Sequence, residues 1–121
     1  MKIILTTETS LAAALLKQQI ITAVKGENTN ILIDTWSYKR SGDNYDIIYH
    51  NPSQYIDSPG KNVLFRVEVD GTEVFFSTAW WINNPQPANE MLCLHTGRLT
   101  EMLLSNFSSN FIKFNVVDFI S

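Results

Sequence analysis

Apolar and polar positions alternate most clearly between residues 62 and 81, in the segment NVLFRVEVDGTEVFFSTAWW. The pair Asp70-Gly71 stands between two runs of β-branched and aromatic residues, which is the strongest short-range signal for a β-hairpin. A two-residue turn at this pair brings the apolar side chains of both runs onto one face, and we predict that this face packs on the core. The expected cross-strand pairs on it are Val69 with Thr72, Val67 with Val74 and Phe65 with Phe76.

The second face of this hairpin carries charge. In the same register Glu68 lies opposite Glu73, and like charges directly across a ladder destabilise it. Either Arg66, diagonal to Glu73, or a bulged turn with a shifted register relieves the repulsion, or the two carboxylates form an acidic patch for a basic partner. The whole face consists of Leu64, Arg66, Glu68, Glu73, Phe75 and Ser77.

The remaining chain predicts two helices and four further strands. Apolar residues recur at 3.6-residue spacing after a Thr/Ser cap, up to the helix-ending Gly26. Ser41-Gly42-Asp43 is typical of a turn between two strands. Met91–His95 fits either a short strand or a helical turn. Outside the 62–81 hairpin we expect a strand over Lys2–Thr6, a helix over Thr9–Lys25, paired strands over Asn30–Lys39 and Asn44–His50, a loop over Asn51–Lys61, a helix over Thr96–Phe107 and a strand over Phe111–Phe119.

The order β-α-β-β-β-β-α-β predicts a single α+β domain over residues 1–121. We expect a mostly antiparallel sheet of five to six strands with two helices packed on it. The formal net charge of −3 disfavours a nucleic-acid binder, which needs basic residues to neutralise phosphates. Cys93 is the only cysteine, so no intrachain disulfide can form. No apolar run resembles a signal peptide or a membrane span, and we expect a soluble, cytoplasmic protein without membrane partners.

Two residue pairs are candidates for catalysis. Cys93 and His95 would share one face of a strand as a thiolate–imidazole pair, although a cysteine in an apolar run is more often a small buried hydrophobe. Asp34 could orient His50 across the first hairpin, or the two could form a structural hydrogen bond. The chain shows neither zinc-ligand spacing nor a Gly-rich phosphate loop. We therefore expect no enzymatic activity, no metal and no cofactor.

Aromatic residues are the richer signal. Trp80 and Trp81 are adjacent on an extended segment, so their side chains face opposite sides and one of them is expected outside the core. Trp and Tyr are enriched in interface hot spots, and several acidic residues lie near these rings in the sequence. We predict one contiguous partner-binding surface that consists of Asp43, Asp46, Tyr55, Asp57, Glu68, Asp70, Glu73 and Trp81.

The chain resembles the small cytoplasmic immunity proteins of bacterial polymorphic and contact-dependent growth inhibition toxin systems. The likeness rests on a Leu/Ala-rich helix after a Thr/Ser cap (TTETSLAAALL), on an aromatic strand end before a Pro-containing loop (VEVDGTEVFFSTAWW, then NNPQP), and on a late helix with a closing strand (LHTGRLTEMLLSNF, FIKFNVVDF). The resemblance implies a monomer that binds one cognate toxin domain in a 1:1 complex and blocks its active site. Many of these toxins are nucleases or deaminases with basic channels, which an acidic, aromatic surface suits.

Two other functions are compatible with the sequence. The chain could be a small ligand-binding or enzymatic α+β domain, which requires a deep pocket between sheet and helix lined by Trp36, His50 and Tyr49. It could also be a structural or accessory subunit that dimerises through an edge strand.

Overall fold

A computed structural model describes residues 1–28 and 30–117. Its elements are β1 (Lys2–Thr6), α1 (Ser10–Val24), β2 (Trp36–Arg40), β3 (Asp46–His50), α2 (Ser53–Ile56), β4 (Leu64–Asp70), β5 (Glu73–Ala79), α3 (Asn89–Phe107), a 3₁₀ turn (Ser108–Asn110) and β6 (Lys113–Val117). The strands form one antiparallel sheet in the order β2-β3-β4-β5-β1-β6. The α+β class and the order of the elements predicted from the sequence are confirmed.

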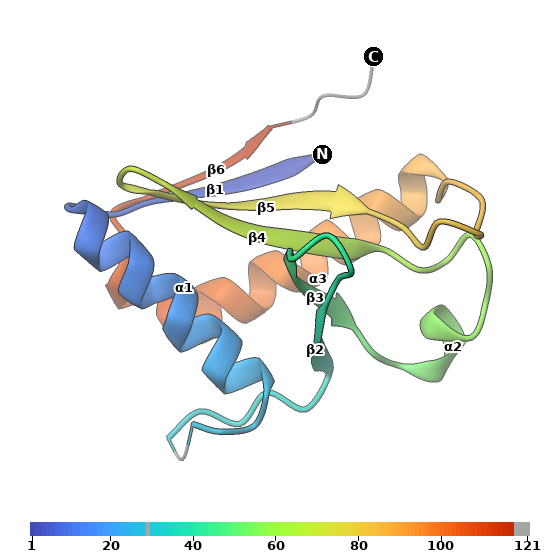
Figure 1. The fold of residues 1–121 in the computed structure, drawn as a ribbon, viewed down its shortest axis with the longest axis horizontal. Coiled ribbons are helices and arrows are strands. Elements are labelled where there is room, and N and C mark those ends of the chain that lie inside the picture. Colours follow the sequence, from blue (N-terminus) through green and yellow to red (C-terminus); the bar gives the residue numbers. More distant parts are fainter. Residues whose placement is uncertain (29, 118–121) are drawn as a thin grey trace.

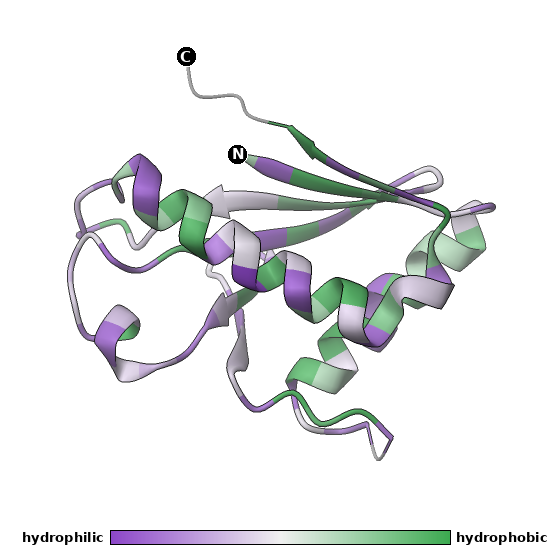
Figure 2. Cartoon of the chain, turned by 180° about the vertical axis from the view of Figure 1, so that it is seen from behind, coloured by the Kyte–Doolittle hydropathy of each residue, from purple (hydrophilic) through white to green (hydrophobic). Residues whose placement is uncertain are grey.

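Both long helices lie on one side of the sheet (Figures 1 and 2). We call this side of the sheet the helix face. The opposite side carries no helix within the described residues, and we call it the open face. Side chains alternate between the two faces along each strand, so a residue's position in the register decides which of these environments it meets.

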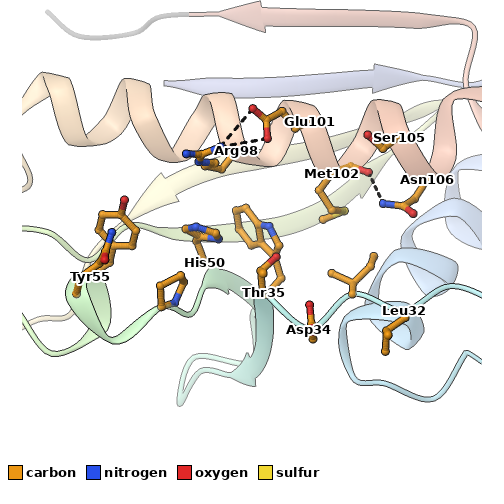
Figure 3. Close-up of a pocket in the computed structure, with 14 residues that line it drawn as sticks. Leu32, Asp34, Thr35, His50, Tyr55, Arg98, Glu101, Met102, Ser105 and Asn106 are labelled. Carbon is orange, nitrogen blue, oxygen red and sulfur yellow. Dashed lines mark hydrogen bonds and ion pairs between the residues drawn. The ribbon is translucent and has the colours of Figure 1, made fainter.

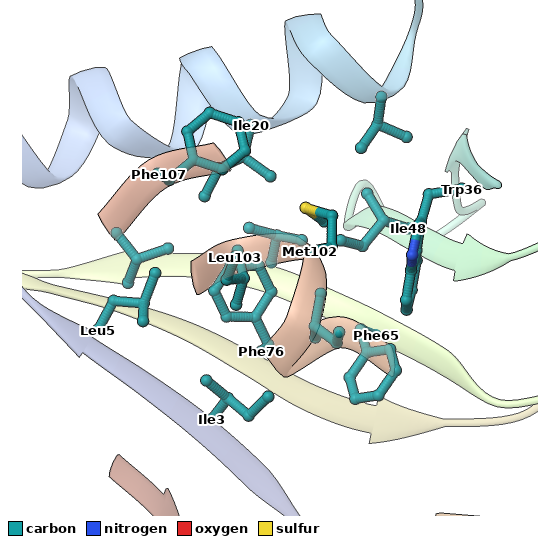
Figure 4. Close-up of a cluster of buried hydrophobic side chains, with 14 of the residues drawn as sticks. Ile3, Leu5, Ile20, Trp36, Ile48, Phe65, Phe76, Met102, Leu103 and Phe107 are labelled. Carbon is teal, nitrogen blue, oxygen red and sulfur yellow. The ribbon is translucent and has the colours of Figure 1, made fainter. Parts of the chain in front are cut away.

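The core fills the space between the helix face and the two long helices (Figure 4). Phe65 and Phe76 from the central hairpin are at most 1% exposed, as are Leu103 and Phe107 from α3. The first helix contributes the apolar side that its spacing predicts: Ala13, Leu16, Ile20, Ala23 and Val24. Thr9 caps this helix by accepting a hydrogen bond from the Ala12 amide at 3.0 Å, and Gly26 follows its end with a φ of +75°.

The central hairpin has the predicted faces but not the predicted register. Asp70 pairs with Glu73, and Gly71 and Thr72 are the central residues of the turn. Only Gly71, at φ +58°, has a positive φ there, which is the pattern of a type II′ turn. The expected turn, with Asp70 and Gly71 as its central residues, requires a positive φ at Asp70 as well. In the observed turn only the glycine has a positive φ. Each expected pair is displaced by two residues on one strand, so the side chains keep their faces. Glu68 therefore lies opposite Phe75 and not opposite Glu73.

The second strand is shorter than expected. Residues 30–35 were predicted to belong to it, but β2 begins at Trp36, which pairs with His50. The partner strand β3 ends there because Pro52 follows Asn51 and has no backbone N–H to continue the ladder. The Asn51 amide still donates to the Thr35 carbonyl at 2.9 Å, but residues before Thr35 have no strand to pair with. The main-chain oxygen of Asp34 instead accepts a hydrogen bond from Asn51 Nδ2 at 2.9 Å.

The third helix is longer than expected. It begins at Asn89, so Met91–His95 is helical, and Thr96 is buried in the helix interior and does not cap it. The buried residues Leu92, His95, Leu99 and Met102 repeat at helical spacing, and this stripe continues the predicted helix toward its N-terminus. The expected loop at 51–61 contains the single turn of α2. The last strand covers Lys113–Val117, and its expected end at Phe119 lies outside the described residues.

Among the described residues, no helix is both long and apolar enough to cross a membrane.

Candidate functional site

Three carboxylates stand at the turn of the β4–β5 hairpin, and we call Glu68, Asp70 and Glu73 the acidic end. Asp70 and Glu73 face each other directly across the ladder, and Glu68 is exposed on the same, open face. Within the described part of the chain none of the three takes part in an ion pair or a side-chain hydrogen bond. The like-charge opposition that the sequence suggested therefore exists, but between Asp70 and Glu73.

Hydrogen bonds from the start of the chain hold the turn of the acidic end. Thr7 is 3% exposed, and both its amide and its hydroxyl donate to the Thr72 carbonyl at 2.8 Å. The same hydroxyl also lies 2.8 Å from the Thr9 carbonyl, so it can serve only one of the two oxygens at a time. These contacts join the hairpin turn to the β1–α1 connection, and the carboxylates are presented on an ordered backbone.

Asp46, a member of the predicted surface, is engaged inside the molecule. Its carboxylate accepts a hydrogen bond from the Tyr38 hydroxyl and forms ion pairs with Lys17 at 2.9 Å and Arg40 at 2.8 Å. Burial alone would raise the pKa of this carboxyl, but the hydrogen bond from Tyr38 and the Lys17 ammonium, together with Arg40, outweigh it and lower the pKa to about 2. The hydrogen bond to Asp46 in turn raises the pKa of Tyr38. Asp46 is thus a structural anion that ties α1 to the first hairpin.

The predicted surface is divided by the fold. Asp43 is exposed in the β2–β3 turn, and Asp46 and Glu68 line one shallow depression of about 330 Å³. Tyr55 and Asp57 belong to α2 and its C-cap, and α2 lies at the opposite end of the molecule from the β4–β5 turn (Figures 1 and 2). The expectation of one contiguous surface is therefore wrong, because the loop after β3 carries α2 away from both hairpin turns.

Trp81 is not the more exposed of the two adjacent tryptophans. Its ring packs edge-on to Tyr49 with centroids 6.3 Å apart, and Lys39 Nζ lies 4.1 Å above its centroid. Trp80 is 38% exposed. The expectation that the two indoles differ in environment holds, but the exposed indole is Trp80.

A groove of about 590 Å³ lies between α3, α2 and the chain before β2 (Figure 3). Trp36, His50 and Tyr55 form its aromatic part. Arg98 and Glu101 of α3 stand across from His50 and Tyr55. Arg98 Nη1 lies 3.4 Å from Glu101 Oε2, one helical turn apart. The sequence did not reveal this groove, because residues 32–35 were expected to lie in a strand and the segment that contains α2 was expected to be a loop.

Two histidines lie at the groove: His50 lines it, and His95 is buried next to His50. His95 is 1% exposed, its ring centroid is 5.9 Å from that of His50, and Tyr55 packs on both rings at 4.9 and 5.5 Å. Neither nitrogen of His95 makes a hydrogen bond within the described residues. Burial, and then the nearby His50, lower the pKa of His95 to about 4, although the Lys61 backbone acts in the opposite sense. Burial also lowers the pKa of His50, and Arg98 adds to this, whereas the Thr35 backbone and Glu101 oppose it.

This geometry does not form the two catalytic pairs suggested by the sequence. Cys93 is exposed and His95 is buried, because residues two apart on a helix point to different sides. Asp34 and His50 both line the groove, but no hydrogen bond between their side chains is formed in the described structure. No three His, Cys, Asp or Glu side chains among the described residues are placed to hold a metal ion.

The chain was compared with protein-family models, curated proteins and solved structures, and none of them matches it.

Proposed function

We propose that this protein is a non-enzymatic binding protein of the immunity type, which neutralises a cognate bacterial toxin domain by docking an acidic surface on it. The observation that carries the proposal is the acidic end. Three carboxylates, the exposed Glu68 and Asp70 and the half-buried Glu73, share an anchored hairpin, and none of them has an ion-pair partner in the described structure. The order of the elements, which resembles that of immunity proteins, supplies the class of partner.

Electrostatics favours a basic partner. Opposing carboxylates repel each other and destabilise the ladder that carries them. A cationic surface docked on them would relieve this repulsion and attract both carboxylates. The Asp46 carboxylate shows the contrast, because the fold surrounds it with two cations and a hydroxyl. A basic substrate channel of a nuclease or deaminase fits the acidic end, and attraction between the two surfaces would speed association at low salt.

Chemistry in the groove supports a binding role. Burial lowers the pKa of both imidazoles, and no cluster of described residues is placed to hold a metal ion. We therefore assign the function to a surface and not to a reaction.

The test is co-purification with the protein encoded immediately upstream of this gene, produced as its C-terminal domain. The proposal predicts a 1:1 complex with a dissociation constant below about 1 μM, and loss of the toxic activity on mixing. Failure of that domain to bind at micromolar concentration would count decisively against the immunity role.

The groove favours a second candidate function, the binding of a small ligand. Trp36 and His50 line it, as that hypothesis requires, and its volume of about 590 Å³ is within the range of small-molecule sites. Tyr49, however, lies on the open face and packs against Trp81. Quenching of the Trp fluorescence by a metabolite library would support this candidate only if Tyr55→Ala abolishes the response.

A further inference from the structure

The last strand leaves one edge of the sheet without a neighbour. Strand β6 pairs with β1 on one side, and no described strand lies on its other side (Figure 1). Unpaired backbone N–H and C=O groups at such an edge are a template for pairing with another strand, and proteins usually block them with charged side chains, lysine above all. The opposite edge strand, β2, carries Lys39 and Arg40, whereas β6 has one cation, Lys113, at its first position.

The alternation of hydrogen bonds along β1 shows which residues of β6 point toward the free edge. The amide of Thr7, which continues β1, donates to the Thr72 carbonyl of the β4–β5 turn. Backbone groups alternate sides along an antiparallel strand, so the odd-numbered residues of β1 bond to β5 and the even-numbered residues bond to β6. The even-numbered residues of β1 pair with the odd-numbered residues of β6. The backbone N–H and C=O groups of Phe114 and Val116 therefore point away from the sheet.

The side chains at these two positions extend the apolar layer of the helix face to the free edge. Phe114 lies opposite Leu5 and Val116 opposite Ile3, and both of these β1 residues are fully buried. Val116, in contrast, is 49% exposed, and Phe114 is half-buried. A further strand beside β6 would remove this apolar surface from water, which favours association.

The sequence of β6, Lys-Phe-Asn-Val-Val, is complementary to itself when two copies run antiparallel. With Asn115 opposite Asn115 of a second copy, Phe114 lies opposite Val116 of that copy, and Lys113 opposite Val117. The outward backbone groups of Phe114 and Val116 then form hydrogen-bonded pairs in both directions. Each aromatic side chain meets a β-branched one, which stabilises a ladder, and no two like charges face each other. A two-fold interface requires this reciprocity between the copies.

We propose that β6 pairs with β6 of a second copy of this chain, antiparallel about a two-fold axis at Asn115, and joins the two six-stranded sheets into one. The ladder is short, so we expect a weak dimer with a dissociation constant of roughly 10–300 μM. The acidic end belongs to β4 and β5, and β1 separates these strands from β6. Each copy therefore keeps its acidic end available, and the dimer does not depend on the proposed toxin partner.

The first test is sedimentation equilibrium of the wild-type chain from about 5 to 500 μM, where the mean mass should rise from that of a monomer toward that of a dimer. Val116→Lys places a charge at the free edge, and Val116→Pro removes an N–H that β1 does not use. Each substitution acts twice across the two-fold axis and should weaken association roughly tenfold or more. Ile82→Lys is the matched control, because Ile82 is 96% exposed and lies outside β6. Far-UV circular dichroism verifies that each variant is folded.

Cysteine cross-linking tests the register. Residues that face each other in a non-hydrogen-bonded antiparallel pair have Cα atoms about 4.5 Å apart, which suits a disulfide. In a Cys93→Ser background, which removes the exposed native cysteine, Asn115→Cys should form a disulfide-linked dimer with oxidised glutathione as the oxidant. Lys113→Cys is the matched control, because in this register Lys113 lies roughly 13 Å from its own counterpart. It should cross-link far more slowly.

Three results would overturn the proposal. A wild-type chain that stays monomeric at about 500 μM would show that β6 does not pair with itself. Unchanged association of both Val116 variants would assign the dimer to another surface, and equal cross-linking of the two cysteine variants would exclude the register centred on Asn115. If Val116→Pro does not fold, Val116→Lys and the cysteine variants still decide. None of these results depends on the upstream gene product, so this proposal and the immunity role fail separately.

Discussion

Asp46 and His95 are both withdrawn from water, but one remains charged and the other remains neutral. Both are ionisable side chains largely withdrawn from water, Asp46 at the start of β3 and His95 in α3 beside the groove. Asp46 keeps its charge because Lys17, Arg40 and Tyr38 surround it, and its pKa falls to about 2. His95 has no hydrogen-bond partner among the described residues and stays neutral among rings, with a pKa near 4. The fold therefore keeps the Asp46 side chain charged by surrounding it with partners, and keeps the His95 side chain neutral by burying it without them.

The comparison shows which charges the fold leaves exposed. Where a carboxylate is withdrawn from water, as in Asp46, the chain supplies partners, because an unpaired buried charge is costly. Glu68, Asp70 and Glu73 have no such partners and remain at the surface, where a basic partner can use them. The difference separates an acid that stabilises the fold from acids that are available for recognition.

The largest expected effect concerns His95 and pH. Its folded-state pKa lies below the ordinary 6.5, so between about pH 6.5 and pH 4 the unfolded chain binds a proton that the folded chain does not. Stability should therefore fall by about 3 kcal/mol as the pH falls through this window. His95→Leu should remove most of this slope and be close to neutral at pH 7, because the imidazole makes no hydrogen bond that is lost.

Urea unfolding at pH 7, 5.5 and 4.5 measures this effect, with His50→Gln as the companion variant. A wild-type stability that is flat from pH 7 to pH 4.5 would show that His95 is not withdrawn from water as described.

A smaller effect is expected at the opposite end, from Asp46→Asn. The variant keeps the shape and the Tyr38 contact but loses the attraction to Lys17 and Arg40, and we expect it to cost about 1–2 kcal/mol after allowance for the exposed Arg40. Because the pKa of Asp46 is lowered, its contribution is present above about pH 4 and disappears as the pH falls toward 2. Thermal unfolding at pH 7 and pH 2.5 measures both, and Asp43→Asn, in the exposed turn, should change neither.

The sequence predicted the helix α1 and the central hairpin well, but it did not predict the groove. Helix α1 and the faces of the central hairpin follow from spacing, capping and alternation, and these are local signals. The register of the hairpin depended on whether Asp70 takes a positive φ together with Gly71 or Gly71 takes it alone. The alternation of apolar and polar residues is the same in both registers and does not decide between them. The groove required that residues 32–35 lie outside β2 and that α2 follow β3, which places Tyr55 beside His50. Such a site is formed by segments distant in sequence, so no local pattern contains it.

The smallest effect is expected at the anchor of the acidic end. Thr7→Val keeps the volume but removes the hydroxyl that donates to the Thr72 carbonyl, and we expect a cost of about 1 kcal/mol. Hydrogen exchange should be faster at the β4–β5 turn and unchanged at His95 and its neighbours. Equal exchange at the turn in both proteins would mean that the backbone contact from Thr7 suffices to hold it.

The most direct test of the proposed function is the affinity of the upstream-encoded toxin domain for the Glu68→Lys/Glu73→Lys variant, measured by titration calorimetry at low and high salt. The matched control is Glu27→Lys/Glu90→Lys, which makes the same charge change at exposed positions away from the acidic end. The account predicts a loss of about 30-fold or more in affinity, equivalent to about 2 kcal/mol, for the first variant and little change for the second. It also predicts that salt weakens the wild-type complex. Wild-type affinity in the Glu68→Lys/Glu73→Lys variant at low salt would contradict the account and leave the acidic end as fold scaffold alone.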